Sequence, residues 1–245
     1  MTAFGLPKVM GHRGAAAYAP ENTLAGIREA AQRGVRWVEV DAKLTGDGVV
    51  ILMHDDTLDR TTTGQGAVAR ASHALIAALD AGAWFAENWR GIGVPTLADA
   101  VALLSELDMH ANIEIKPCPG REAETARSVV EVIRRHWPSA RPWPLLSSFS
   151  PLSLGVARDI GRDVPRGLLI WEYTTEWASV ADDLGCVSIH CADQHLNREW
   201  AAGIRRADYA LAVYTVNDPD RAVELATWGV QCLISDRPDV IINAV

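Results

Sequence analysis

Short apolar runs alternate with longer amphipathic stretches along most of the chain, a pattern typical of parallel βα units. The runs predict eight parallel strands, at residues 9–12, 37–41, 111–116, 145–148, 167–170, 187–190, 210–216 and 232–235. Eight such units in 245 residues match the size of one α/β barrel. We therefore predict the α/β class and a TIM (β/α)8 barrel, as a single domain over residues 1–245.

The intervening stretches carry signals that mark helix ends. Thr96 followed by Asp99 is a capping box at the start of an apolar stripe. Asp218, which precedes a proline, begins another helix, and that helix ends at Gly229. The first helix of the barrel is expected to end at Gly34.

An additional apolar run at residues 49–54 is separated from the second strand by a short turn at residues 45–48. Because this turn is too short for the crossover that a parallel neighbour requires, we expect an antiparallel hairpin. The segment at about 44–95 is then an insertion between strand two and helix two, and long connections at a barrel mouth often shape the substrate site. Within it, Trp84, Phe85 and Trp89 form either a small core or a lid, and the preference of aromatic side chains for burial favours the core.

Composition restricts the classes of partner. The chain has 49% hydrophobic residues and a formal net charge of -8, and binders of nucleic acid or of anionic membranes usually carry a basic patch instead. No apolar run reaches the ~18 residues of a membrane span, and the start of the chain lacks a signal-peptide pattern. We therefore expect a cytoplasmic protein with no stable membrane association. The four cysteines, Cys118, Cys186, Cys191 and Cys232, lack metal-binding spacing and are predicted to be buried free thiols.

Acidic residues recur where two predicted strands end. Alternation along a strand places Glu39 and Asp41 on one face, and likewise Glu114 and Lys116. Three carboxylates supply only oxygen ligands, which suit Mg²⁺ or Ca²⁺ rather than Zn²⁺. The alternative is a set of structural ion pairs with nearby cations: Arg13, Arg36, Lys43 and Lys116. Both interpretations stand on spacing alone.

Two histidines and two cations complete a candidate catalytic set. His12 and His54 are candidates for proton transfer, because imidazole both gives and takes a proton near neutral pH. A hydrogen-bonded structural role is the alternative for each histidine. Arg13 and Lys116 are candidates to hold phosphate oxygens, the first with parallel donors and the second as a point charge.

Further polar and aromatic residues fall where barrel loops meet a pocket. The candidates for substrate contact are Glu21, Ser148, Phe149, His190, Tyr214 and Asn217. Structural roles are the alternative for these residues, because strand ends also need polar caps. Asn22 precedes the first helix and is expected either to cap it or to contact substrate.

These residues lie in segments that resemble the glycerophosphodiester phosphodiesterase family. The segments are His12-Arg13-Gly14, Pro20-Glu21-Asn22-Thr23, Glu39-Val40-Asp41, His54-Asp55, Asn112-Ile113-Glu114-Ile115-Lys116-Pro117, Leu146-Ser147-Ser148-Phe149 and Tyr214-Thr215-Val216-Asn217. Within the family, residues 166–169 and 185–190 resemble cytoplasmic bacterial members that work with a glycerol 3-phosphate uptake system. Tyr214 is a departure, because many members carry Trp there.

The resemblance implies an activity and a role for each group. It implies a divalent cation, Mg²⁺ or Ca²⁺, held by Glu39, Asp41 and Glu114, and catalysis by His12 and His54. The small-molecule substrate would be a glycerophosphodiester, cleaved to sn-glycerol 3-phosphate and an alcohol. Two alternatives remain: a lysophospholipase D acting on acylated glycerophosphodiesters, and a barrel that binds phosphate esters without turnover.

Overall fold

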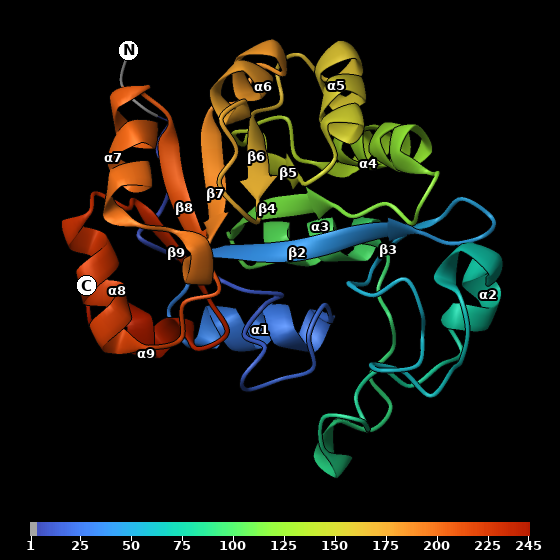
Figure 1. Ribbon diagram of the computed structural model, residues 1–245. Coiled ribbons are helices and arrows are strands. Elements are labelled where there is room, and N and C mark those ends of the chain that lie inside the picture. The colour runs from blue at the N-terminus through green and yellow to red at the C-terminus, as the bar shows by residue number, and fades with distance from the viewer. Residues whose placement is uncertain (1–3) are drawn as a thin grey trace.

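The computed structural model describes residues 4–245, in which eight parallel strands close into a barrel with helices around its outside (Figure 1). The barrel strands are β1 (Val9–Gly11), β2 (Trp37–Leu44), β4 (His110–Ile115), β5 (Leu145–Ser148), β6 (Arg166–Ile170), β7 (Ser188–Ala192), β8 (Ala210–Tyr214) and β9 (Cys232–Ser235). Closure is direct, because β1 pairs in parallel with both β2 and β9. The predicted TIM barrel is confirmed.

Several of the helices begin at a residue whose side chain caps the helix. The helices are α1 (Leu24–Gln32), α3 (Leu97–Glu106), α4 (Glu122–His136), α5 (Pro151–Ile160), α6 (Trp177–Asp183), α7 (Arg198–Arg206), α8 (Pro219–Thr227) and α9 (Pro238–Ile242), with a 3-10 turn, η3, at Asp193–His195. The capping box at Thr96 and Asp99 forms as predicted. Asp218 caps α8, and Gly229 follows that helix with a φ of 84°, a conformation that favours glycine.

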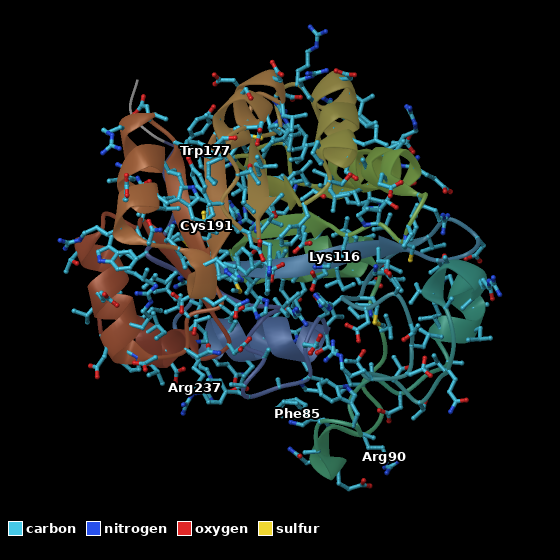
Figure 2. All side chains as sticks on the ribbon, in the orientation of Figure 1. Phe85, Arg90, Lys116, Trp177, Cys191 and Arg237 are labelled. Carbon is cyan, nitrogen blue, oxygen red and sulfur yellow. The ribbon has the colours of Figure 1, made fainter. Side chains whose placement is uncertain are left out.

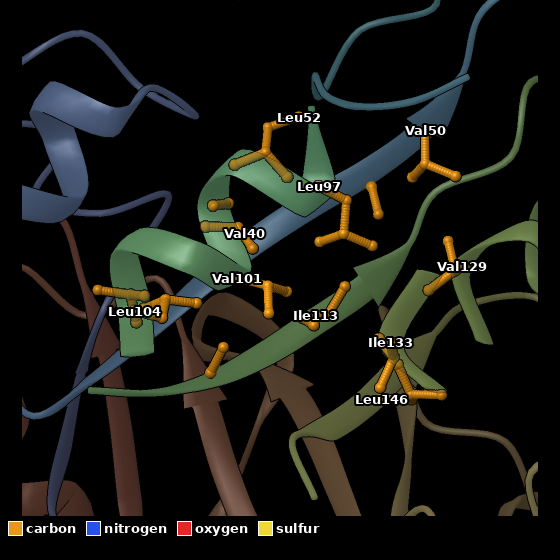
Figure 3. Packing of buried hydrophobic residues seen from close by; sticks show 14 of the residues in the cluster. Val40, Val50, Leu52, Leu97, Val101, Leu104, Ile113, Val129, Ile133 and Leu146 are labelled. Carbon is orange, nitrogen blue, oxygen red and sulfur yellow. The ribbon is translucent and has the colours of Figure 1, made fainter. Parts of the chain in front are cut away.

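Strand alternation separates the core from the site. On β2 and β4, Val40 and Ile113 face outward and pack against Leu97 and Val101 of α3 (Figure 3). The neighbouring residues on each strand face the barrel interior, because successive side chains point to opposite sides of a strand. Polar residues of these strands, such as Glu114, therefore face the barrel interior. The packing of α3 against the outward apolar residues holds the strands in place.

Between β2 and α3 the chain leaves the barrel. β3 (Val50–Leu52) pairs antiparallel with the end of β2, as predicted from the short turn. It is followed by η1 (Val68–Arg70), α2 (His73–Ile76) and η2 (Glu87–Trp89). β3, η1 and α2 contribute to a small, mainly aliphatic cluster that includes Ile51, Met53 and Ile76.

The expected aromatic core of this insertion is wrong. Aliphatic side chains fill its interior, and Trp84 is 39% exposed with its ring edge-on to Phe85. Phe85 and Arg90 lie on a tip that projects away from the barrel (Figure 2). The small interior is already occupied, so the aromatic pair packs on itself outside it.

Two further expectations concern the cysteines and membrane-spanning helices within residues 4–245. All four cysteines are free and buried, as predicted. No helix in this range combines the length and the apolar character needed to cross a bilayer.

Candidate active site

Three carboxylates meet inside the barrel near the carboxyl ends of β2 and β4. Asp41 and Glu114 are directly opposite each other in the β2–β4 pairing, and Glu39 lies two residues before Asp41 on the same face. One oxygen from each of the three lies within 4.8 Å of the others, and all three residues are buried. Burial, reinforced by the charge of Asp41, raises the pKa of Glu39 well above its usual range and that of Glu114 to about 7.

Two cationic side chains contact this group of three carboxylates. Arg13 Nε lies 3.3 Å from Asp41 Oδ2, and Lys116 Nζ lies 2.9 Å from Glu114 Oε1 and 3.6 Å from Asp41 Oδ1. With all three carboxylates ionised, the two cations leave one negative charge in excess, and buried charge without a partner is costly. The set therefore fits a hard cation, which such oxygen ligands suit.

Lys43, one of the cations expected as an alternative partner, is placed elsewhere. Its side chain is only 1% exposed, and its Nζ donates to Asp56 Oδ1 at 2.6 Å. Because β2 extends beyond Asp41, Lys43 lies one further inward-facing position along the strand, and it pairs with the insertion rather than with the three carboxylates.

Asn22 supports Asp41 rather than capping helix α1. Its Nδ2 donates to Asp41 Oδ2 at 2.8 Å, and the Asp41 backbone N–H donates to Asn22 Oδ1 at 3.0 Å. Thr23 is the N-cap instead, because its Oγ1 accepts from the backbone of Gly26 at 3.1 Å. Although burial alone would raise the pKa of Asp41, Arg13 and the Asn22 hydrogen bond help to hold it below its ordinary value.

His12 follows β1 and is oriented by an aspartate that sequence reasoning missed. Its Nδ1 lies 2.6 Å from Asp236 Oδ1, and its Nε2 lies 3.9 Å from Glu39 Oε2. Asn217, expected in the substrate pocket, instead donates from Nδ2 to Asp236 Oδ2 at 2.7 Å. Asp236 directly follows β9, so its position at a strand end was the available signal.

His54 arrives from the insertion and has a carboxylate partner of its own. Its Nδ1 lies 2.7 Å from Asp55 Oδ1, which leaves Nε2 as the ring nitrogen available for proton exchange. Burial lowers the pKa of His54, and the nearby charges of Arg13 and Lys116 lower it further. Both candidate histidines therefore have Nδ1 held by a carboxylate.

The two histidines, both cations and two of the carboxylates line one cavity of about 230 Å³. The complete lining is His12, Arg13, Glu39, His54, Asn112, Glu114, Lys116, Phe149, Leu169, Trp171, Tyr214, Thr215 and Ile234. A neighbouring cavity of about 480 Å³ shares His54, Glu114, Lys116 and Phe149 with it, and also has Lys43, Asp56 and Ser150 in its wall. In Figure 2, Lys116 lies near the middle of the molecule.

One wall of the smaller cavity is aromatic. Phe149 and Tyr214 meet edge-on with ring centroids 6.0 Å apart, and the Tyr214 hydroxyl donates to the Ile170 carbonyl at 3.1 Å. Trp171 adds a half-exposed ring at the same cavity. The structure thus brings Phe149 and Tyr214 to the site together with Trp171, which the sequence analysis did not select.

Four expected pocket residues lie outside this cavity, and one of them is Asn217, which binds Asp236. Ser148 lines only the larger cavity, and its Oγ donates to the Ile115 carbonyl at 2.7 Å. Glu21 lies between Arg13 and Arg60, with Oε1 2.7 Å from Arg13 Nη1.

His190 is likewise outside the cavity, because β7 does not end where it was predicted to end. The strand continues to Ala192, so His190 is an inner residue of the strand and is 0% exposed. Its Nε2 lies 2.9 Å from Ser188 Oγ, and burial lowers its pKa to about 4. A neutral structural histidine matches this environment.

Asn112 lines the site, although the sequence alone indicated no role for it. It is 1% exposed, it lines the smaller cavity, and neither its Nδ2 nor its Oδ1 has a hydrogen-bond partner among the described residues. Its position two residues before Glu114 on the same strand face was the available signal.

Comparisons with known proteins agree with this geometry. Residues 12–240 match the model of the glycerophosphoryl diester phosphodiesterase family. A glycerophosphodiester phosphodiesterase of Caldanaerobacter subterraneus subsp. tengcongensis is 31% identical over 241 residues, which cover 97% of each chain. The structure of an Oleispira antarctica phosphodiesterase in complex with the product sn-glycerol 3-phosphate has a TM-score of 0.95 and 36% identity, and the match covers 98% of this chain and 96% of that one.

Proposed function

The chain belongs to the glycerophosphoryl diester phosphodiesterase family and is a phosphoric diester hydrolase, and we propose that it hydrolyses glycerophosphodiesters to sn-glycerol 3-phosphate and an alcohol. The observation that carries this proposal is that two members of a buried cluster of three carboxylates line one cavity together with two cations and two carboxylate-bound histidines. The product bound to the Oleispira antarctica phosphodiesterase supports the choice of substrate.

Glu39, Asp41 and Glu114 would hold a divalent cation, with Mg²⁺ and Ca²⁺ as the candidates from their oxygen chemistry. When bound, such an ion supplies Lewis-acid polarisation of a phosphoryl oxygen. Arg13 and Lys116 bind the remaining phosphoryl oxygens and offset the charge that develops during the reaction.

His12 and His54 move the protons. One histidine removes a proton from the attacking oxygen and the other gives a proton to the departing alkoxide. Asp236 and Asp55 accept from the respective Nδ1 atoms, which holds each imidazole with Nε2 toward the reaction.

The attacking oxygen is proposed to be the neighbouring glycerol hydroxyl, followed by opening of the cyclic phosphate by water. A positioned internal nucleophile avoids much of the entropic cost of a bimolecular step. Phosphorus NMR during turnover tests this route: a cyclic glycerophosphate that rises and then decays supports it. Direct incorporation of solvent oxygen in a single step, with the cyclic ester never turned over by the enzyme, refutes it.

Asn112 is proposed to recognise the glycerol hydroxyls. A carboxamide offers both a donor and an acceptor, and both Asn112 groups lack protein partners beside Glu114. A substrate that lacks hydroxyls would leave a buried amide unpaired, which costs free energy.

A polar leaving alcohol fits better than an acyl chain. The larger cavity beside His54 has Lys43, Asp56, Ser148 and Ser150 in its wall next to Ile115, Pro117 and Phe149, and an apolar chain placed there would desolvate the charged groups of Lys43 and Asp56. This disfavours the lysophospholipase D alternative. The paired histidines disfavour a barrel that only binds phosphate esters.

The deciding experiment is enzyme-coupled detection of glycerol 3-phosphate from glycerophosphocholine, glycerophosphoethanolamine and glycerophosphoglycerol, with and without chelator. Turnover of all three with loss on chelation supports the proposal. Preference for long-chain lysophospholipids, or no turnover of any diester, contradicts it.

The cytoplasmic location and the likeness to members that work with glycerol 3-phosphate uptake stay predictions. Cell fractionation tests the first, and growth on glycerophosphodiesters tests the second.

A further inference from the structure

Arg60 joins two carboxylates that come from different parts of the chain. Its Nε and Nη2 donate to Asp55 Oδ2 and Oδ1 at 2.7 and 2.9 Å. Its Nη1 and Nη2 donate to Glu21 Oε2 and Oε1 at 2.8 Å each. One planar guanidinium therefore holds both carboxylates with two hydrogen bonds apiece, a geometry that a lysine ammonium cannot reproduce.

Each of these carboxylates has a second partner in the candidate site. Asp55 Oδ1 lies 2.7 Å from His54 Nδ1, and Glu21 Oε1 accepts from Arg13 Nη1 at 2.7 Å. A continuous set of hydrogen bonds thus runs from His54 through Asp55, Arg60 and Glu21 to Arg13. His54 and Asp55 belong to the insertion, whereas Arg13 and Glu21 belong to the segment between β1 and α1.

The positions of these groups indicate what the connection is for. The Arg60 side chain is 44% exposed, and exposed ion pairs typically contribute only ~0–1 kcal/mol to stability. The side chain of Glu21, which connects Arg60 to Arg13, is 11% exposed and does not line the cavity of about 230 Å³. A connection that contributes little to stability and has a group of the site at each end is suited to positioning.

We propose that Arg60 is a positioning residue, which aligns His54 of the insertion with Arg13 of the barrel so that both act on one phosphodiester. This inference rests on the proposed function. No local sequence pattern connects Arg60 to its partners, because they are 5 and 39 residues away and come together only in the folded chain.

The test compares Arg60→Ala and Arg60→Lys with the control Arg90→Ala. Arg90 makes an equally bidentate pair with Glu87, at 2.6 and 2.7 Å, on the projecting tip of the same insertion (Figure 2). We expect Arg60→Ala to lower kcat on glycerophosphocholine by on the order of 10²-fold, the cost of a displacement of about 1 Å. Arg60→Lys should recover part of this loss, and Arg90→Ala should match the wild type.

Chemical rescue separates positioning from folding. Millimolar guanidinium should restore part of the turnover of Arg60→Ala, because the exposed site admits the free ion, and it should leave Arg90→Ala unchanged. Adding Arg60→Ala to Asp55→Ala should cost less than the sum of the two single losses, because both act through His54. Additive losses together with no rescue would overturn the proposal, even if Arg60→Ala were poorly active.

Two outcomes distinguish this inference from the proposed function. A wild-type enzyme active on glycerophosphodiesters with Arg60→Ala within two-fold of it overturns the positioning role alone. A wild-type enzyme inactive on every diester refutes the proposed function. In that case calorimetry with sn-glycerol 3-phosphate still tests the Arg13 end of the connection: weaker binding by Arg60→Ala supports it, and unchanged binding refutes it.

Discussion

At the scale of single residues, the site is a set of side chains whose hydrogen-bond partners fix their orientation. His12 and His54 each have Nδ1 bound by an aspartate, although one aspartate directly follows β9 and the other belongs to the insertion. The same local arrangement at two places leaves Nε2 of each ring without a carboxylate hydrogen bond, as the proposed acid and base roles require.

We predict that His12→Ala and His54→Ala each lower turnover by roughly 10²- to 10⁴-fold while the fold is kept, the usual contribution of a positioned acid or base. A diester with a nitrophenolate leaving group needs little protonation on departure, so it should restore the variant that lacks the general acid. Steady-state kinetics of both variants on both substrates checks this. Equal losses throughout would contradict distinct roles.

Asn112 gives a prediction about selectivity. Asn112→Ala should raise the KM for glycerophosphodiesters by roughly 2- to 10-fold, as expected for a lost hydrogen bond worth ~0.5–1.5 kcal/mol. Its activity on bis(nitrophenyl) phosphate, which has no glycerol hydroxyls, should change little. Comparable KM changes on both substrates would show that Asn112 only shapes the barrel interior.

At the scale of elements, the hairpin and the helix after the insertion position the site. β2 extends beyond the barrel to Leu44, β3 returns along it, and His54 follows β3 by two residues. The insertion ends where the capping box of Thr96 and Asp99 starts α3, and α3 then packs on the outer faces of β2 and β4.

Loss of this cap should therefore affect stability more than chemistry. We predict that Thr96→Ala lowers the free energy of unfolding by about 1 kcal/mol, the typical contribution of an N-cap side chain, with kcat unchanged. Denaturant unfolding monitored by tryptophan fluorescence, beside steady-state kinetics, measures both quantities. A large fall in kcat at preserved stability would mean that the start of α3 acts on the site directly.

At the scale of the whole molecule, the three carboxylates link folding, pH and metal. The folded-state pKa of Glu114 is raised to about 7, above the ~4.3 of an unfolded glutamate. The folded state then binds more protons than the unfolded state between these values, so its stability falls as pH rises through them. The contribution of Asp41 to stability depends on pH in the opposite direction. Because the pKa of Asp41 is lowered in the folded state, this contribution is lost only when pH falls below the ordinary carboxyl range.

We predict that the metal-free protein loses thermal stability between about pH 5 and pH 8, and that Mg²⁺ or Ca²⁺ restores it increasingly over the same range, because only ionised carboxylates bind the cation. Calorimetric Tm values with chelator and with each metal test this. Glu114→Gln should weaken the pH dependence and the metal effect together. A metal-induced rise in Tm that is the same at every pH would contradict this linkage.

The sequence by itself determined the architecture and the placement of the three carboxylates. Local signals were sufficient for the eight strands, the antiparallel hairpin and the caps at Thr96 and Asp218, because turn length, alternation and side-chain capping act over a few residues. Alternation alone placed Glu39 beside Asp41, and parallel pairing then brought Glu114 to them.

Only the tertiary structure decided which residues hold the site together. His12 is bound by Asp236, Glu21 by Arg60 and Asp41 by Asn22. The members of each pair are too far apart in the sequence for strand or helix periodicity to connect them. The same limit explains the errors at His190 and at the insertion aromatics. A strand end that depends on pairing with neighbours, and a core that depends on available volume, are set by contacts that form only when the barrel closes.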